Sequence, residues 1–280
     1  MKIMKKILLL AIFAISILCG CKKEDEGNGA AQEPQITLTT NKKVGETIVL
    51  RFLRESKPTE VIGATKISED ESDMDGGIFE AGVVDVTYAL TSQTVVVKGD
   101  IYNLRCRDNG LTTLDVSKCP ELIILQCDNN QLTRLKVGDN SKLQYLDCDN
   151  NQLTQLDVNK KTYLEVLSCS GNKLTSLDVS KNLELGALYC DNNKLTFLDV
   201  SKNTKLYELD CRHNEIKEVE MSKIIEALPD WTGNKRIWHY SGSPIQYATI
   251  RAVSTNSNEG NVISEADIKI AEKKNWKVSN

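Results

Sequence analysis

The sequence holds few of the side chains and motifs that enzymes and metal sites need. Its 280 residues include two histidines, and no G-x-S-x-G, H-E-x-x-H, phosphate-loop or dinucleotide-binding motif occurs in it. C-x-x-C pairs, which commonly hold zinc, are absent too. Because no set of nucleophile, base and orienting group emerges, we expect a protein that is not an enzyme and that uses no cofactor or metal.

Basic charge and long apolar runs are scarce as well. The chain has 35 lysines and arginines against 39 aspartates and glutamates, and three of the lysines lie in residues 1–20. Without those residues the chain carries 32 basic and 39 acidic side chains, a net charge of −7. No basic stripe stands out, so nucleic acid is not an expected partner. The apolar run from Ile7 to Leu18 is too short for a helix that spans a membrane.

The first 34 residues have the pattern of an export signal and a tether. Lysines followed by a short apolar run predict a secretory signal peptide over residues 1–20. The "LCGC" at its end resembles a bacterial lipobox, with Cys21 as the lipidated residue. Residues 21–34 are rich in Gly, Ala and charge, which predicts a flexible tether. Their acidic trio is similar to the export tag of surface lipoproteins in some Gram-negative bacteria.

This resemblance implies an outer-membrane protein that is held by its lipid alone and displayed at the cell surface. Two alternatives stay open. The anchor faces the periplasm instead, or the signal is an ordinary one that is cleaved without lipidation.

Internal repetition organises the middle of the chain. Six cysteines recur at a spacing of 21 residues, namely Cys106, Cys127, Cys148, Cys169, Cys190 and Cys211. Each follows a leucine by two residues and precedes an asparagine by three, and these asparagines are Asn109, Asn130, Asn151, Asn172, Asn193 and Asn214. A fixed period is the sequence signature of a solenoid, in which each coil buries its apolar side chains against the next. Six units fill residues 101–226.

The second half of each unit repeats the L-x-x-L-x-[C/V] pattern of the first, as in "LTQLDV" at residues 153–158. Alternating inward residues favour strands over helices, so we expect a parallel β ladder with two strand-like runs per coil. A horseshoe with short 3₁₀ segments on its convex side is the alternative. The frame resembles the leucine-rich repeat, and it is most similar to internalin-like bacterial repeats that carry a cysteine in the strand. The resemblance implies a leucine-rich repeat solenoid that is mainly β.

The cysteines are interpreted as packing residues and the asparagines as turn residues. A side chain two residues after an inward leucine also points inward in a strand, where a thiol is a small apolar filler. A disulfide ladder and a zinc site are alternatives, but parallel side chains bridge poorly and a line of cysteines is not a tetrahedron. Cys119 replaces a second-half turn asparagine, and it is either an exposed thiol or a substitute in the turn. The asparagine amides are expected to satisfy backbone groups.

The two outward faces of the coils differ. On the second half the outward column is nearly constant, with Asp115, Asp157, Asp178 and Asp199. Lysines follow these aspartates by three residues, which favours a solubilising charge ladder over a calcium site. On the first half the outward residues vary, and an apolar strip of Ile124, Tyr145 and Val166 lies beside acidic and amide groups. Exposed apolar residues on a rigid sheet are typical of recognition surfaces.

The residues predicted to contact a partner are Ile124, Gln126, Asp128, Tyr145, Asp147, Asp149, Val166, Tyr189 and Asp191. The alternative is that these side chains only cover one another and bind nothing. A solenoid sheet is often an extended binding surface, which favours the first interpretation.

The flanking segments are predicted to cap the solenoid. Residues 35–100 contain several alternating runs, which predict an N-terminal β cap. Their acidic stretch 69–77 is interpreted as a solvated loop, although a calcium site there stays open. Residues 227–280 are predicted to form a C-terminal cap with one helix, in which Ser264 is the N-cap and Asp267 completes a capping box.

All three tryptophans lie in the C-terminal segment: Trp231, Trp238 and Trp276. We expect them to be buried on the last coil. A sugar-stacking platform of Trp231, Trp238 and Tyr240 is the alternative, since amphipathic rings suit either role.

These patterns together predict a monomeric, lipid-anchored protein that mediates protein–protein recognition or adhesion at the bacterial cell surface. A glycan-binding surface lipoprotein and a structural spacer without a specific ligand are the alternatives. A resemblance in fold cannot by itself name the ligand.

Overall fold

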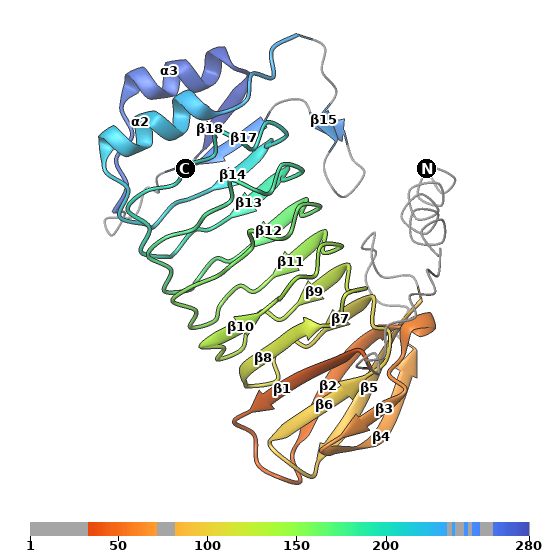
Figure 1. Ribbon diagram of the computed structural model, residues 1–280. Helices are drawn as coiled ribbons and strands as arrows, with labels where there is room; N and C mark the ends of the chain where they lie inside the picture. The colour runs from red at the N-terminus through yellow and green to blue at the C-terminus, as the bar shows by residue number, and fades with distance from the viewer. Residues whose placement is uncertain are drawn as a thin grey trace, which may run out of the picture.

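The computed structural model describes residues 33–71, 82–233, 237–238, 244–245, 248–252 and 260–279. The chain forms an elongated stack of coils with a β sandwich at one end and two helices at the other (Figure 1). Cys21, the predicted signal peptide and most of the predicted tether lie outside the described residues, as do residues 72–77 of the acidic loop. Within the described ranges, no helix has the length and apolar character needed to cross a bilayer.

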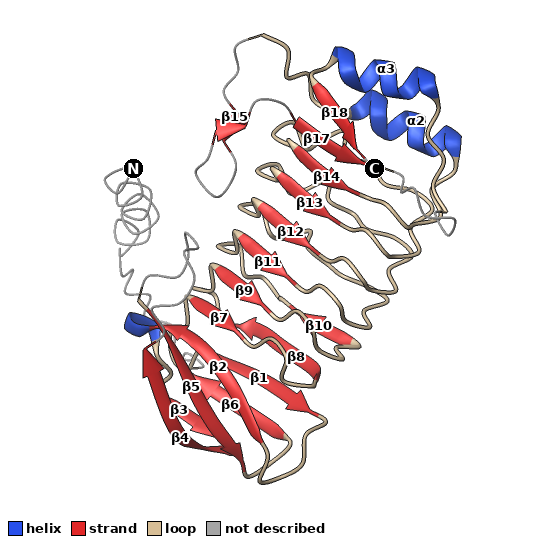
Figure 2. Ribbon diagram, turned by 180° about the vertical axis from the view of Figure 1, so that it is seen from behind, coloured by secondary structure: helices blue, strands red, loops and turns tan. Residues whose placement is uncertain are grey.

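One side of the stack, here called the strand side, is a ladder of short strands. These strands are β7 (Asn103–Arg105), β9 (Ile124–Gln126), β11 (Tyr145–Asp147), β12 (Val166–Ser168), β13 (Ala187–Tyr189) and β14 (Glu208–Asp210). They pair in parallel and in register, so that Leu146 lies between Leu125 and Leu167 of the neighbouring coils. The predicted parallel ladder and mainly-β solenoid are confirmed, and Figure 2 shows the strands stacked along the molecule.

The other side of each coil, here called the return side, is regular strand only near the N-terminal end. β8 (Leu111–Lys118) and β10 (Arg134–Lys136) pair in parallel. In the next coil the return run keeps a backbone hydrogen bond to its predecessor, from Gln152 N to Leu132 O at 2.9 Å. The leucines and valines of the later runs are still buried. The two runs of a coil therefore share one interior, although their backbones pair differently.

The N-terminal segment covers the first coil with a two-layer sandwich. Its elements are β1 (Gln35–Thr40), β2 (Thr47–Leu53), the 3₁₀ turn η1 (Arg54–Ser56), β3 (Glu60–Ile62), β4 (Ala64–Glu71), β5 (Val83–Leu90) and β6 (Thr94–Lys98). β1 pairs antiparallel with β8 on the return side, and β2 pairs antiparallel with β7 on the strand side. Each layer of the sandwich thus continues one side of the coil, and no apolar coil end is left open there.

The second half of the sixth repeat differs from the expectation. It was predicted to continue the return run, but residues Glu218–Ala227 form the helix α2. Met221, Ile224 and Ile225 are buried, and their spacing of three and four residues places them on one helical face. A helical apolar pattern has replaced the strand pattern, so the repeat frame ends half a coil early and the C-terminal cap region holds two helices.

After α2 the chain adds two more rungs to the strand side. The elements that follow are β15 (Ile237–Trp238), β16 (Pro244–Ile245), β17 (Ala248–Arg251), α3 (Glu265–Lys273) and β18 (Trp276–Ser279). β17 pairs in parallel with β14, placing Ile250 beside Leu209, and β18 pairs in parallel with β17. The sheet therefore extends past the last repeat that the 21-residue spacing identifies.

The predicted capping box of α3 is confirmed. The Ser264 hydroxyl accepts from Asp267 N at 3.1 Å, and the Asp267 carboxylate accepts from Ser264 N at 3.2 Å. Two donors at the start of the helix are satisfied in this way. The α3 helix packs beside α2 over the end of the stack (Figure 1).

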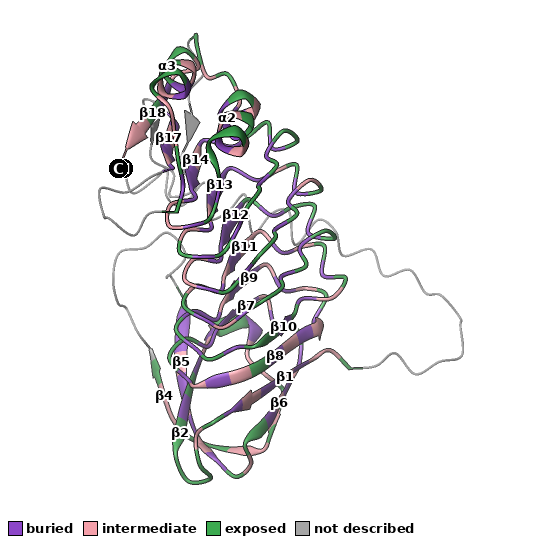
Figure 3. Cartoon of the chain, turned by 90° about the vertical axis from the view of Figure 1, so that its left-hand side faces the viewer, coloured by how far each residue is buried: buried purple, intermediate pink, exposed green. Residues whose placement is uncertain are grey.

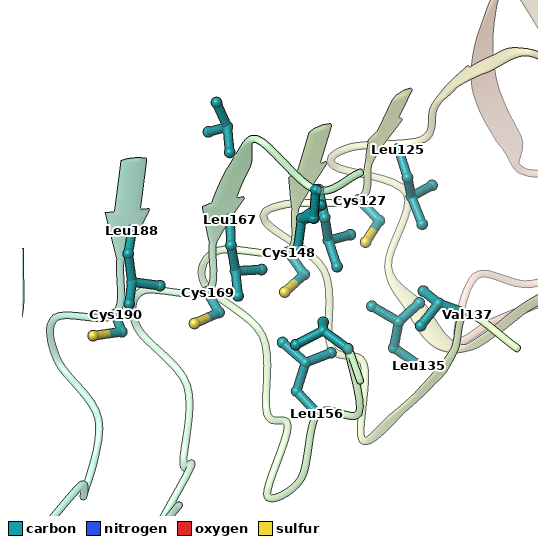
Figure 4. Close-up of a cluster of buried hydrophobic side chains, with 14 of the residues drawn as sticks. Leu125, Cys127, Leu135, Val137, Cys148, Leu156, Leu167, Cys169, Leu188 and Cys190 are labelled. Atoms are coloured by element: carbon teal, nitrogen blue, oxygen red, sulfur yellow. The ribbon is translucent and has the colours of Figure 1, made fainter. Parts of the chain in front are cut away.

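The core is one continuous cluster of apolar side chains with members in the sandwich, the coils and the helices. Figure 3 shows buried residues along the length of the stack. In Figure 4, the strand-side leucines and cysteines of successive coils project inward, and Leu135, Leu156 and Val137 of the return side meet them. No coil could bury this surface alone, because each leucine contacts its counterparts one coil away. The packed coils hold the strands rigidly, and the strands position the outward side chains.

Candidate binding face on the strand side

Asparagine side chains fix the turn that follows each strand. The Nδ2 of Asn151 donates to the carbonyls of Cys127 and Cys148, both at 3.0 Å. Its Oδ1 accepts from the Leu132 N–H at 2.9 Å. The same bonds recur at Asn130, Asn172, Asn193 and Asn214. Each amide therefore joins two coils and uses both of its ends.

The two caps terminate this ladder with the same chemistry. Asn109 exchanges two hydrogen bonds with the backbone of Val49 in β2, at 2.7 and 2.9 Å. At the other end Asn261, which lies outside the 21-residue frame, donates to Cys211 O at 2.6 Å and accepts from Ile216 N at 3.0 Å. Asn261 is a seventh rung that sequence reasoning missed.

A left-handed residue completes each turn. Positive φ angles of 50–57° occur at Asp108, Asn129, Asn150, Asn192 and His213. In the remaining coil Gly171 takes the position with φ 65°, and a Cβ there would lie 2.5 Å from Asn150 Oδ1. Asparagine, aspartate and glycine adopt this region at low cost, which explains most of the residue choices.

The cysteines are packing residues on the inward side. All six ladder cysteines and Cys119 are fully buried thiols. Burial raises the pKa of five ladder thiols far above the ordinary value, so their reactive thiolates are suppressed; these are Cys106, Cys127, Cys148, Cys169 and Cys190. Burial also raises the pKa of Cys119 to about 11, and its Sγ donates to Ile101 O at 3.4 Å. Cys119 is thus not exposed and takes the role of a substitute in the turn.

The outward residues of the six strands and the residue two positions beyond each strand form what we call the strand face. It brings together the side chains predicted to contact a partner, because the register aligns their columns. Three of them are less exposed than predicted: Ile124 at 8%, Val166 at 2% and Asp128 at 5%. Rungs about 4.8 Å apart let neighbouring side chains cover one another, so exposure was overestimated for these three.

The partly exposed residues of the predicted set are Gln126, Tyr145, Asp147, Asp149, Tyr189 and Asp191. They surround the buried Val166 and Ala187 in the middle of the ladder. The accessible part of the strand face is therefore polar and aromatic. Of the apolar strip expected from the sequence, Ile124 and Val166 are buried and Tyr145 stays accessible.

Basic side chains neutralise the two ends of the strand face. Near the sandwich, Arg107 lies 3.0 Å from the carboxylate of Asp128. Near the helices, Asp210 lies 2.7 Å from Arg212 and 3.6 Å from Arg251. Charge pairs of this kind are strongest where burial removes water, and both aspartates are buried.

Acidic side chains crowd the middle of the strand face. Burial, with repulsion from Asp149 and Asp128, raises the pKa of Asp147 to about 7. Burial also raises the pKa of Asp149 to about 6, although Ser168 Oγ donates to it at 2.7 Å and Ser170 N at 2.6 Å. These two carboxylates therefore change charge near neutral pH.

The aspartates of the return side behave differently. The carboxylate of Asp178 accepts from Ser180 N at 2.9 Å, and that of Asp199 accepts from Ser201 N at 2.8 Å. These backbone bonds lower the pKa of both carboxyls. Each return-side aspartate is satisfied by its own coil, which accounts for the near-constant column in the sequence.

The C-terminal aromatics are engaged with the end of the stack. The Trp276 indole is buried and donates to Pro229 O at 2.8 Å. The Trp231 indole donates to Leu206 O at 2.8 Å and packs against the core. The side chain of Trp238 and the whole of Tyr240 lie outside the described residues, so the predicted sugar platform is untested.

No family model matches this chain, and no curated protein matches it. Its fold is similar to that of a leucine-rich repeat protein from Leptospira interrogans, with 20% identity and a TM-score of 0.46 over 64% of this chain and 48% of that one. An internalin, InlF, from Listeria monocytogenes has 17% identity and a TM-score of 0.46 over 63% of this chain and 46% of that one. The functional domain of InlJ from the same organism, which includes a cysteine ladder, has 24% identity and a TM-score of 0.31 over 66% of this chain and 50% of that one.

The chain spans about half the length of these solved structures. The assignment of its fold rests on its own coils, since the likenesses are all at low identity. Leucine columns, in-register parallel rungs and an asparagine ladder recur every 21 residues. The chain is a leucine-rich repeat solenoid of mainly β structure.

Proposed function

We propose that this chain recognises a protein partner through its strand face while a lipid on Cys21 anchors it at the bacterial cell surface. The observation that carries the proposal is a contrast within each coil. The inward leucines, cysteines and asparagines hardly vary, whereas the outward residues of the same strands differ from rung to rung. A constant frame with varied decoration suits recognition, because the frame positions side chains without an entropic cost at binding.

Two half-buried tyrosines support a role in contact. Tyr145 stands on the same strand as Asp147, and Tyr189 stands two strands further along the accessible middle of the strand face, in the coil of Asp191. Tyrosine is enriched at binding hot spots, since it offers a large rigid surface and a hydroxyl together. A partner would contact these rings with little rearrangement of the chain, because the strands already hold them in place.

Two matched variants test the recognition surface. The double variant Tyr145→Ala and Tyr189→Ala removes two rings from the strand face. The control Tyr163→Ala and Phe197→Ala removes two rings that are 58% and 52% exposed elsewhere on the coils. With the mature chain immobilised and surface extracts as the source of partner, we expect the first variant to weaken capture at least about tenfold.

The control variant is expected to capture as the parent does. Urea unfolding of both variants shows that each is folded. The recognition proposal fails if both variants bind equally well, or if the control alone loses the partner.

Anchoring is tested separately. Intact-mass analysis of the membrane fraction is expected to find an acylated N-terminal Cys21, and protease treatment of whole cells is expected to degrade the chain. An unmodified mature chain in the medium would contradict the anchor, and protection from protease would place it on the periplasmic side. Loss of adherence in a strain carrying the strand-face variant would extend recognition to adhesion.

A further inference from the structure

The basic side chains of the strand face lie at its ends, and its middle carboxylates have none. Arg107 pairs with Asp128 at one end, and Arg212 pairs with Asp210 at the other. Among the described residues, no basic side chain lies within 4.0 Å of the carboxylates of Asp147, Asp149 or Asp191. Three aspartates on two coils are thus left without a positive partner between two neutralised ends, with Asp147 and Asp149 on one coil and Asp191 on the other.

Two buried polar groups on the same face also lack partners. Asn103, at the start of the Tyr145 column, is 1% exposed, and within the described ranges neither its Oδ1 nor its Nδ2 makes a hydrogen bond. In Asp128 the Oδ2 accepts from Asn129 and Arg107, but the Oδ1 is buried and has no described partner. Unsatisfied buried groups are costly, so they point to a ligand that supplies the missing bonds.

The arrangement suits an organic cation better than a metal ion. In the described part of the chain no three His, Cys, Asp or Glu side chains converge as metal ligands would. Asp147 and Asp149 lie two residues apart in one coil, and Asp191 lies two coils further along the ladder. A guanidinium or ammonium group is satisfied by one or two carboxylates and stacks on a tyrosine ring, which Tyr145 offers on the same strand as Asp147.

We infer that the middle of the strand face binds a positively charged, extended segment of its protein partner, with a lysine or arginine side chain seated between Asp147 and Asp149. This inference rests on the proposed recognition function and gives the partner its chemistry. Tyr145, on the same strand as Asp147, lies beside the cation, and further basic residues of the segment run along the ladder past Tyr189 toward Asp191. The segment lies across the rungs, because Asp149 and Asp191 occupy one column two coils apart.

Such binding is linked to protons. The charged groups that face Asp147 are Asp149, Asp128 and Arg107, and those that face Asp149 are Asp128 and Asp191, with the Ser168 hydroxyl beside it. Because burial and repulsion raise the pKa of both carboxyls, they are largely neutral in mild acid and charged in mild base. A cation binds the charged form, so affinity must rise with pH.

A synthetic hexa-arginine peptide is the probe. Calorimetric titration of the full mature chain is expected to show binding at about pH 8 that weakens at least about tenfold at about pH 5.5. The variant Asp147→Asn with Asp149→Asn keeps an oxygen for the bonds from Ser168 and Ser170, and it is expected to lose both the binding and its pH dependence.

The matched control is Asp178→Asn with Asp199→Asn, which removes the same charge from the return side. It is expected to bind as the parent does. Equal weakening by both variants would show diffuse attraction to an acidic protein and would overturn the inference, as would binding that does not change with pH. If the tyrosine variant still abolishes partner capture while the peptide fails to bind, the recognition function stands and the cationic segment is wrong.

Discussion

The two sides of each coil use asparagine for different tasks. On the strand side Asn193 donates to Cys169 O and Cys190 O, and it accepts from Leu174 N at 2.9 Å. On the return side of the same coil Asn203 donates to Val179 O and Asn182 O, at 3.0 and 2.9 Å. Its Oδ1 is buried without a partner among the described residues.

The difference explains which residues each position accepts. The return-side column reads Cys119, Asn140, Lys161, Asn182 and Asn203. Cys119 donates to Ile101 O, and the Lys161 ammonium donates to Gly138 O. A thiol, an amide and an ammonium can each donate a hydrogen bond, and a donor is all that this turn requires. The strand-side turn requires a donor and an acceptor together, and the six repeats keep asparagine there throughout.

Aspartate shows the same division. Asp178 and Asp199 on the return side are exposed and accept backbone bonds from their own coil. Asp147 accepts a similar bond from Asp149 N at 3.2 Å, but burial and repulsion from Asp149 raise its pKa. The constant column is structural. The aspartates of the strand face are crowded and partly buried, so their negative charges are unfavourable. Functional sites commonly hold charged groups in this way.

The largest expected effect contrasts the two asparagine positions. The substitution Asn193→Lys leaves Leu174 N without an acceptor and forces an ammonium into a buried turn, so we expect a loss of at least about 3 kcal/mol in the free energy of unfolding. Asn203→Lys keeps the donor and is expected to lose about 1 kcal/mol. Urea unfolding of both variants measures this, and equal losses would break the comparison.

Cysteine provides the next test. Cys169→Ser places a hydroxyl among leucines and is expected to cost about 1–3 kcal/mol. Cys119→Ser keeps a donor for Ile101 O, so its cost should stay below about 1 kcal/mol. Thermal unfolding of the two variants gives the order, and a larger loss at Cys119 would contradict a donor-only turn.

The third prediction concerns Asp147 and pH. Its folded pKa of about 7 lies above that of the unfolded chain, so the folded state binds the extra proton and stability falls as pH rises between about 4 and 7. Asp147→Asn is expected to stabilise the chain by about 1–2 kcal/mol at pH 8 and to change little at pH 4. Urea unfolding at the two pH values tests this, and the mostly exposed Asp178→Asn should stabilise the chain at neither.

The smallest expected change comes from Lys161→Asn. Burial lowers the pKa of the Lys161 ammonium, so the unfolded chain binds the proton more tightly and stability rises with pH up to the ordinary lysine range. The variant restores the common residue and should stay within about 1 kcal/mol of the parent near neutral pH. Its unfolding free energy should no longer rise in alkali, and an unchanged rise would assign that effect to another group.

The repeat frame could be predicted because each coil imposes the same local rules. The asparagine ladder, the inward cysteines and the capping box at Ser264 follow from spacing and side-chain chemistry, and the structure contains them. These features depend on contacts that repeat at a fixed distance along the chain.

The features that sequence reasoning missed depend on contacts that do not repeat. The helix α2 interrupts the frame, so Asn261 and Ile250 reach their rungs from outside the 21-residue register. The burial of Val166 depends on the side chains of the neighbouring strands, and the alternation of residues along its own strand does not reveal them. The raised pKa of Asp147 arises in the same way, from burial by its neighbours and from repulsion by Asp149 and Asp128.

The most direct test is a titration of the aspartate carboxyl carbons by NMR. We expect Asp147 and Asp149 to titrate with midpoints at about 7 and about 6, and Asp178 and Asp199 to titrate below the ordinary aspartate value. Four carboxyls that titrate together near about pH 4 would contradict this expectation, because the strand face would then hold no strained charge for a cationic partner to relieve.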